Sequence, residues 1–230
     1  LFSSSSSFLH GALTGAFGNA LGGYVAKLMG VPIGTIVCAT NANDAVHRCL
    51  SRGDMSIGMN LETPYPAMDI QFAYNLERLL YYVCNQNCEV VAKYMTQFEA
   101  NRGVQLDSML VDRLHTTFRS CVVSNQETIA AMRLMWQDHN YVVCPHGACA
   151  IHAKSMLAAD LHPSICVLTA HPSKFEDAVL EACGEVPPDT PAVQGLKLLP
   201  RDKFKRLRKD GDGWRADWIR QLKLAVEESG

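Results

Sequence analysis

Short apolar segments alternate with amphipathic helical segments along most of this chain, and this alternation limits the folds that it can adopt. Residues 35–39 form a largely apolar, partly β-branched run, and three similar runs follow it. A strand that is apolar on both faces belongs in a sheet that is covered on both sides. Between these runs, hydrophobic residues recur at helical spacing. Strands that alternate with helices of this length predict the α/β class, with βαβ units and a Rossmann-like parallel sheet flanked by helices.

The same periodicity gives approximate element positions. The expected strands are residues 35–39, 122–123, 141–144 and 165–169. The expected helices are residues 18–29, 44–50, 69–83, 89–100, 106–114, 124–137, 148–159, 174–183 and 214–226. Gly30 is expected to end the first helix, and Ser124 with Glu127 fits a capping box. Asn41 or Asn43 is a candidate cap for the helix at 44–50.

Composition divides the chain into three stretches. We expect residues 1–12, which include five consecutive Ser, to be disordered or unrelated to the rest. Residues 13–185 are expected to form the α/β domain, and residues 186–230 a linker and a final helix. The chain begins with Leu rather than Met, so we treat it as a fragment. The basic run at 201–209 is expected to be a solvated surface segment.

The overall charge and hydropathy argue against two classes of partner. The 230 residues are 48% hydrophobic and carry a formal net charge of -2, without the basic footprint typical of nucleic-acid binding. No apolar run approaches the ~20 residues that span a bilayer. The nine Cys are scattered and odd in number, which suits a reducing compartment better than a disulfide scaffold. We therefore expect a cytoplasmic protein without nucleic-acid or membrane partners.

A glycine loop directly precedes the first predicted helix, and it consists of Gly15, Ala16, Phe17, Gly18 and Asn19. Glycines let main-chain N–H groups approach an anion, and a helix start adds unpaired donors with a favourable dipole. The loop is therefore a candidate phosphate cradle, although an ordinary turn into a helix explains it equally well. No Lys-Ser or Lys-Thr pair follows, so the loop is not a P-loop.

The longer context of this loop resembles the threonine synthase family. That family typically has a G-N-F-G-N or G-N-F-G-D loop followed by a helix, a "GLP" turn and an "ATNxND" segment. The chain has counterparts of these three at residues 14–19, 26–33 and 39–44. Counterparts of the family's "AMDI", "NxER", "PHxA" and "TAHPxKF" motifs follow in the same order, at residues 66–70, 75–79, 144–148 and 168–175. The animal threonine-synthase-like phospholyases share most of these motifs. The Cys-Pro-His form at 144–146 favours that branch.

The resemblance implies a type II pyridoxal-phosphate (PLP) fold, similar to the tryptophan synthase β chain and incomplete here. The loop at 15–19 would hold the cofactor phosphate, and Thr169 would face the pyridine nitrogen. The implied substrate is O-phosphohomoserine, converted to L-threonine and phosphate, or to 2-oxobutyrate by a phospholyase. A homodimer is the candidate assembly. Ala16 stands where the family usually has Asn, so one side-chain contact is missing.

The resemblance also implies a missing partner. In the family, the lysine that forms the Schiff base precedes the glycine loop, as does the Asn that contacts the ring hydroxyl. We therefore nominate no catalytic residue and expect the chain to be inactive alone. The alternative is a truncated, non-catalytic binding or signalling product. Lys27, Lys154 and Lys174 are expected to be solvated residues on helices rather than replacements for the lysine.

Two other features have ordinary explanations. The cluster of Cys144, His146, Cys149 and His152 has a spacing that zinc sites use, but the expected strand before it and the family motif explain these residues without a metal. His171 precedes a proline at a helix entry, so a structural cap is a better explanation than a catalytic base.

Overall fold

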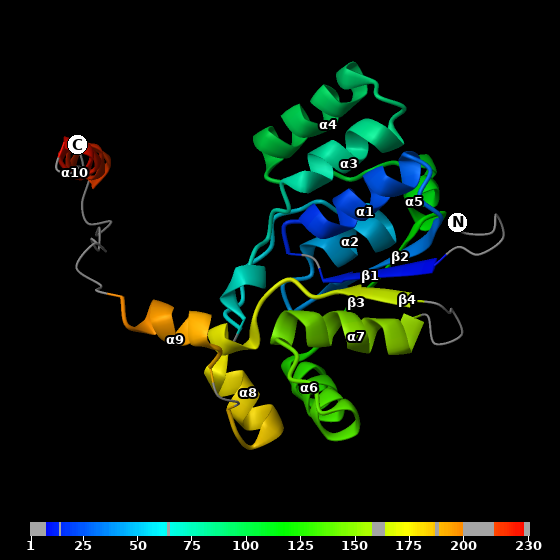
Figure 1. The fold of residues 1–230 in the computed structure, drawn as a ribbon. Helices are drawn as coiled ribbons and strands as arrows, with labels where there is room; N and C mark the ends of the chain where they lie inside the picture. The colour runs from blue at the N-terminus through cyan, green and yellow to red at the C-terminus, as the bar shows by residue number, and fades with distance from the viewer. Residues whose placement is uncertain are drawn as a thin grey trace. The chain divides into compact units, whose positions relative to one another are not determined.

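The computed structural model describes residues 8–13, 15–63, 65–157, 164–186, 189–199 and 214–227 (Figure 1). It divides the chain into two compact units, Leu1–Pro187 and Pro188–Gly230. The basic run at 201–209 lies outside the described residues. In the described parts, no helix combines the length and the hydropathy that a membrane crossing requires.

The sheet of the first unit is parallel, as the alternation of apolar runs and helices predicted. Its described strands are β1 (Phe8–Leu13), β2 (Ile33–Thr40), β3 (Phe118–Val122) and β4 (Ser164–Val167). They lie in the order β3-β2-β1-β4. The α/β class predicted from the sequence is confirmed.

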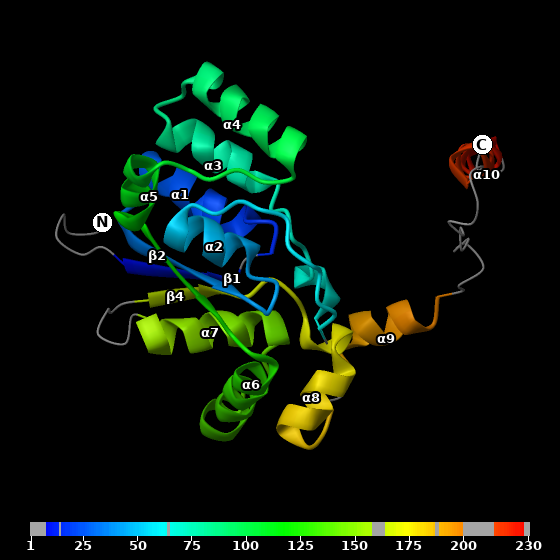
Figure 2. The same cartoon turned by 180° about the vertical axis from the view of Figure 1, so that it is seen from behind.

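Helices cover both faces of this sheet (Figures 1 and 2). On one face lie α1 (Gly18–Leu28), α2 (Ala45–Arg52) and α5 (Ser108–His115), with α3 (Asn75–Val83) and α4 (Cys88–Asn101) packed outside them. On the other face lies α7 (Pro145–Leu157), in contact with α6 (Asn125–His139), which also packs on α8 (Glu176–Cys183). Two 3₁₀ turns, η1 (Pro66–Met68) and η2 (Pro172–Lys174), complete the unit.

Strand β2 shows why the sequence has continuous apolar runs. Ile36 and Cys38 belong to the core between the sheet and the helices of the first face. Val37 and Ala39 belong to the core on the opposite side, where Cys149 and other residues of α7 pack. Successive side chains of a strand point to opposite faces, so both sets are buried only when both faces are covered.

Two of the local signals at helix ends match the structure. Ser124 Oγ accepts a hydrogen bond from the Glu127 N–H (3.2 Å), and Glu127 Oε2 accepts one from the Ser124 N–H (2.8 Å). Gly30 follows α1 with φ 97°, in the left-handed region that glycine adopts without strain. These findings confirm the capping box and the glycine stop.

Three expectations about elements were wrong. Residues 8–12 belong to β1 rather than to an irregular stretch, because their backbone pairs with both β2 and β4. Residues 141–144 form no strand. Val143 and Cys144 are buried as chain that leads into Pro145, and a residue before proline is held in an extended conformation. The helix expected from residue 69 begins only at Asn75, after η1.

The second unit contains two described helices. The first, α9 (Pro191–Lys197), occupies a stretch expected to be a linker. Thr190 caps this helix by accepting a hydrogen bond from the Val193 N–H (3.4 Å). The second, α10 (Trp214–Glu227), is the final helix that the periodicity predicted.

Candidate functional site

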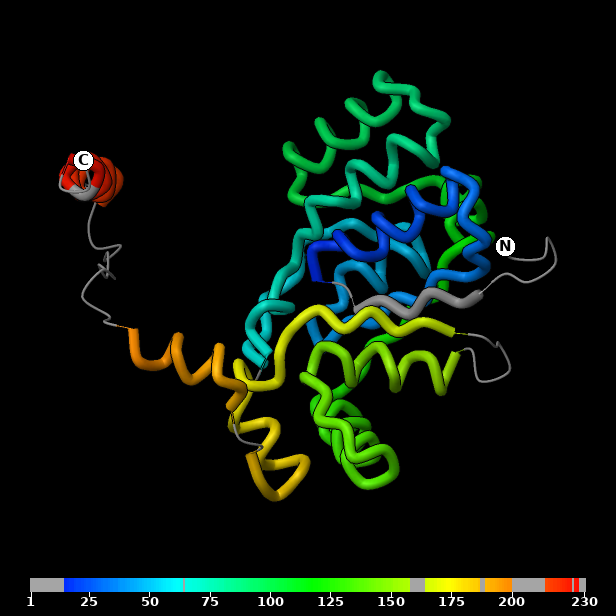
Figure 3. Tube along the Cα trace, in the orientation of Figure 1, coloured from blue at the N-terminus to red at the C-terminus, as the bar shows by residue number. Residues whose placement is uncertain are grey.

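The candidate site is a cavity of about 310 Å³ at the carboxyl edge of the sheet. Its lining comes from the glycine loop, η1, the first turn of α7, the segment after β4, and η2, and includes Gly15, Asn19, Met68, His146, Thr169 and Lys174. These segments converge although they are far apart in the sequence (Figure 3). The cavity is therefore formed by the fold rather than by one local motif.

The strand order explains this position. The chain passes from β1 to β2 and β3 on one side, and then returns to β4 on the other side of β1. In parallel sheets, a crevice forms at the carboxyl ends of two strands between which the order reverses. The glycine loop follows β1, and Thr169 follows β4. Both therefore reach the same crevice.

The main chain of the glycine loop is held tightly. A Cβ atom at Gly15 would lie 3.3 Å from Met68 Cα and 3.4 Å from the Ala67 carbonyl oxygen, so only glycine allows this approach to η1 without a shift. Phe17 has φ 65°, and its ring is fully buried, 5.6 Å from the ring of Phe118. The Phe17 side chain therefore anchors the loop in the core and does not line the cavity.

The loop leads into a helix start that lacks a side-chain cap. Phe17 is the N-cap residue of α1, and no side chain accepts a hydrogen bond from the first turn. The first N–H groups of a helix lack partners within the helix and carry partial positive charge, so they favour an anion. Asn75 Nδ2 donates to the Ala16 carbonyl oxygen (2.8 Å), which fixes the loop to α3.

A polar cluster holds η1 beside the loop. The Asp69 carboxylate accepts hydrogen bonds from Asn41 Nδ2 (2.8 Å), Asn43 Nδ2 (3.1 Å) and the main chain and hydroxyl of Thr63 (2.8 and 2.7 Å). The expectation that Asn41 or Asn43 caps α2 was therefore wrong. The N-cap residue is Asp44, whose carboxylate accepts a hydrogen bond from Arg48 and makes no cap bond.

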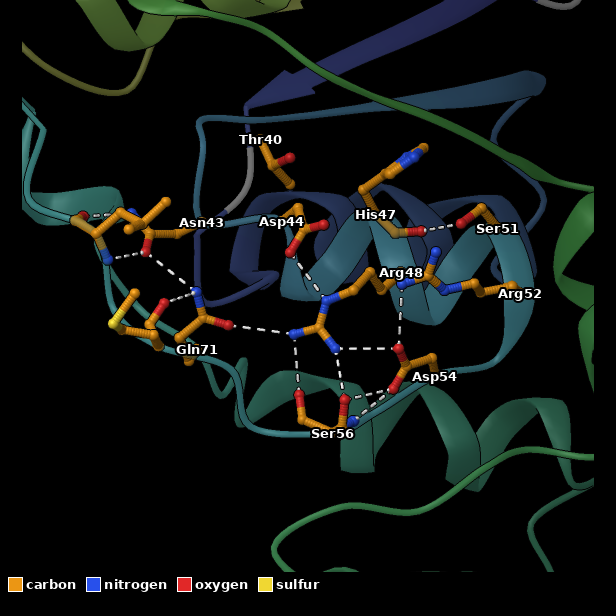
Figure 4. Close-up of polar contacts among 12 residues, drawn as sticks. Thr40, Asn43, Asp44, His47, Arg48, Ser51, Arg52, Asp54, Ser56 and Gln71 are labelled. Carbon is orange, nitrogen blue, oxygen red and sulfur yellow. Dashed lines mark hydrogen bonds and ion pairs between the residues drawn. The ribbon is translucent and has the colours of Figure 1, made fainter.

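Arg48 is the centre of a second cluster, which joins α2 to the segment before η1 (Figure 4). Its guanidinium donates hydrogen bonds to the Asp44 and Asp54 carboxylates. It also donates to the hydroxyl and main-chain carbonyl oxygens of Ser56 and to the side-chain carbonyl oxygen of Gln71. Burial works to raise the pKa of Asp54, but hydrogen bonds from Ser56 and Arg48 outweigh it and hold that pKa well below its usual range. Asp54 is therefore a carboxylate at neutral pH.

The opposite wall of the cavity carries a histidine and a lysine. The His146 ring is 5% exposed and packs edge-to-face on Phe175, with ring centroids 4.8 Å apart. Burial, and then the charge of Lys174, lower the pKa of His146, so its ring is neutral at pH 7. Lys174 ends η2 and is exposed at the cavity.

The lysines differ from expectation. Lys174 lies on a 3₁₀ turn in the cavity wall rather than on a helix. Lys27 is half-buried, and its Nζ donates to the carbonyl oxygens of Ile33 and Gly34, the latter at 2.8 Å. The expectation of a solvated side chain was wrong for Lys27, because carbonyl oxygens at the start of β2 bind its ammonium group. Lys174 is exposed as expected, but it lies on η2 rather than on a helix.

His171 has the structural role that its position indicated. It is the N-cap residue of η2, and its Nδ1 accepts a hydrogen bond from the Ser173 N–H (3.2 Å).

Within the described ranges, no three His, Cys, Asp or Glu side chains are grouped so that they could hold a metal ion. Burial raises the pKa of Cys149 to about 12, so this thiol is protonated.

Comparisons with known proteins agree with this geometry. A family model described as "Threonine synthase, C-terminal" matches residues 147–213. Threonine synthase-like 2 from Xenopus laevis is 33% identical over 218 residues, which cover 93% of this chain and 44% of that protein. The crystal structure of threonine synthase from yeast matches with a TM-score of 0.81 at 28% identity, covering 96% of this chain and 48% of that one.

A further solved structure, PLP-bound threonine synthase from Brucella melitensis, matches with a TM-score of 0.77 at 32% identity. It covers 83% of this chain and 41% of that one. The chain belongs to the threonine synthase family. Its fold is that of the type II PLP enzymes. The chain spans less than half the length of each of these relatives.

The residues that the family resemblance assigned to the cofactor lie at or next to the cavity. Three of them line one cavity: Gly15, Asn19 and Thr169. Gly18 is the first residue of α1, and Ala16 offers its carbonyl oxygen to Asn75. The threonine synthase motifs also contained Met68, His146 and Lys174, but nothing in the sequence indicated that their side chains meet at this cavity.

Proposed function

We propose that this chain supplies the phosphate-binding part of a PLP site in a threonine synthase family enzyme that acts on O-phosphohomoserine, giving L-threonine and phosphate. The observation that carries the proposal is the cavity at the strand-order reversal, where the glycine loop and Thr169 meet. Family membership and the PLP bound in a related solved structure support it.

The residues present fit a small phosphate-bearing ligand. Gly15 leaves bare main chain where a Cβ atom would crowd η1, and α1 begins without a side-chain cap. The residues that line the cavity include a lysine and no carboxylate. The cavity volume lies near the lower end of the range of roughly 300–1,000 Å³ for small-molecule sites.

Each residue then has a simple task. The N–H groups at the start of α1 hold the phosphate. The Thr169 hydroxyl would face the ring nitrogen as a neutral partner, while Met68 and Phe175 would close the cavity with apolar surface. Bound PLP supplies an electron sink that suits elimination and replacement at the β- and γ-carbons of an amino acid.

The test is to compare the binding of PLP with that of pyridoxal, which lacks the phosphate, to this chain by calorimetry. Because the proposed contacts are charge-assisted hydrogen bonds to phosphate, PLP should bind at least about 100-fold more tightly. Equal dissociation constants for the two compounds would contradict the proposal, since the loop would then contribute nothing.

A second candidate is the phospholyase reaction, which turns the same substrate into 2-oxobutyrate. The match to threonine synthase-like 2 over 93% of the chain and the Cys-Pro-His sequence at 144–146 favour it. The product decides between the two. A protein that joins this chain to the family's lysine-bearing segment should release L-threonine in the first case and 2-oxobutyrate in the second.

A further inference from the structure

Lys174 is a positive charge in the cavity wall that has no partner among the described residues. Its side chain is exposed at the cavity, on the last residue of η2. In the parts of the chain that the structure describes, no carboxylate lies within ion-pair distance of it. By contrast, the Lys27 ammonium group donates hydrogen bonds to two main-chain carbonyl oxygens. Lys174 is therefore available to a ligand.

The surroundings of Lys174 favour an anion. The charge acts on His146, whose pKa it lowers in addition to the effect of burial. His146 is therefore neutral, and its Nε2 is buried without a hydrogen-bond partner. None of the described residues that line the cavity carries a carboxylate, whereas Glu176 and Asp177 line a neighbouring hollow that Lys174 also borders. Within the cavity itself, the charge of Lys174 therefore has no compensating carboxylate. A charge in a partly enclosed wall is less screened than one on an open surface, so it attracts a counter-ion more strongly.

We propose that Lys174 binds a phosphate monoester group in this cavity through its ammonium group. The inference rests on the proposed function and extends it to a residue outside the glycine loop. The phosphate can belong to the cofactor or to the substrate, because both carry the same chemical group. In either case Lys174 donates charge-assisted hydrogen bonds to phosphate oxygens, and the cavity selects phosphorylated compounds over neutral ones.

The first measurement is phosphate binding to the full 230-residue chain by calorimetry. Replacing Lys174 with Ala should raise the dissociation constant for inorganic phosphate about tenfold, as expected for the loss of one charge-assisted contact. Lys174→Arg should restore binding to within a few-fold. Lys93→Ala is the matched control, because Lys93 is an exposed lysine on α4 and does not line the cavity. All variants should unfold at the same temperature.

The second measurement uses His146 as a reporter that a purely structural role of Lys174 would not affect. The ring of His146 is titrated by NMR, and its signals are assigned with His146→Gln. Lys174→Ala should raise the pKa of His146, because the opposing charge is gone. Saturating the unaltered chain with phosphate should also raise that pKa, because the bound anion offsets the same charge.

Two further experiments distinguish cofactor phosphate from substrate phosphate, and failure of the Lys174 inference from failure of the proposed function. If Lys174 serves the cofactor, saturation with PLP should abolish phosphate binding; if it serves the substrate, the PLP-loaded chain should still bind phosphate in a Lys174-dependent way. Equal phosphate affinity in the unaltered chain and Lys174→Ala, with weaker binding in Gly15→Ala, would overturn the Lys174 inference and leave the proposed function intact. Binding of neither PLP nor phosphate to the unaltered chain would overturn both.

Discussion

At the scale of single residues, the glycine loop depends on main-chain geometry more than on side-chain chemistry. Gly15 is required because η1 approaches it closely, and Phe17 adopts a left-handed conformation that costs roughly 1–2 kcal/mol for a residue with a Cβ. The burial of the Phe17 ring offsets that cost. The sequence indicated that the loop needs glycine, but it did not show that Met68 is the neighbour that requires it.

Gly15→Ala is the direct test of that close approach. The new Cβ would meet main-chain atoms of Ala67 and Met68, which cannot move as a side chain can. We expect a loss of about 1–3 kcal/mol in the free energy of unfolding and weaker PLP binding. The control is Gly22→Ala on α1, where no atom beyond the neighbouring residues and the helix's own backbone lies within 4 Å of the added methyl group. This variant should be neutral or slightly more stable in urea unfolding. Equal behaviour of the two variants would contradict the account.

At the scale of elements, Arg48 fastens the segment before η1 to α2. Its side chain is 9% exposed and binds Asp54, whereas Arg52 on the same helix binds Asp54 with a side chain that is 64% exposed. The two arginines therefore form a matched pair with a shared partner. Removing the buried one leaves Asp44 and the Ser56 carbonyl oxygen without this donor, and leaves Asp54 with only Ser56 and the exposed Arg52.

Arg48→Met should lower the free energy of unfolding by roughly 3 kcal/mol, because it breaks a largely buried charge cluster. Arg52→Met should change it by less than about 0.5 kcal/mol, because an exposed ion pair contributes little. Urea unfolding monitored by circular dichroism measures both. Similar losses in the two variants would show that burial of the Arg48 cluster is not what stabilises this segment.

The same cluster predicts a pH dependence. The pKa of Asp54 is lower in the folded chain than its unfolded value of about 3.9. Its contribution to stability is therefore complete above about pH 4 and is lost as the pH falls through the folded pKa. The stability difference between the unaltered chain and Asp54→Asn should be constant from pH 7 to about pH 5 and shrink toward pH 2. A difference that grows on acidification would have the wrong sign.

Elements with a local signal could be predicted, and those set by distant contacts could not. The capping box at Ser124 and Glu127 lies within four consecutive residues, so the sequence contains it completely. The apolar run at 141–144 resembles a strand because Val143 and Cys144 are buried, but burial there comes from packing without sheet pairing. The Asn41 and Asn43 side chains bind Asp69, a contact across the fold that no local pattern reveals.

At the scale of the whole first unit, the candidate site depends on strand order. The sequence predicts a parallel sheet, but it contains no local signal for which strand lies beside β1. The order β3-β2-β1-β4 brings the glycine loop and Thr169 to one crevice. Family motifs indicated that both belong to a cofactor site, and the fold supplies the physical reason that they meet.

The same order leaves β3 and β4 at the edges of the described sheet, with Ile165 on β4 half exposed. Exposed apolar edge strands promote aggregation, and an edge lysine opposes it. Ile165→Lys should therefore reduce aggregation, followed by light scattering, without lowering the free energy of unfolding. Ile36→Lys, at a fully buried position on the interior strand β2, should unfold the chain. Faster aggregation of Ile165→Lys would contradict this description of the edge.

The most direct test of phosphate binding at the start of α1 is a titration of this chain with PLP, followed through the backbone amide signals in NMR. We expect the largest shift changes at the start of α1, in Gly18, Asn19 and Ala20, together with Thr169 across the crevice. Pyridoxal without phosphate should leave the α1 signals nearly unchanged. Shift changes confined to another surface, such as the groove lined by Tyr74 at the start of α3 and Tyr81 within it, would contradict phosphate binding by the glycine loop.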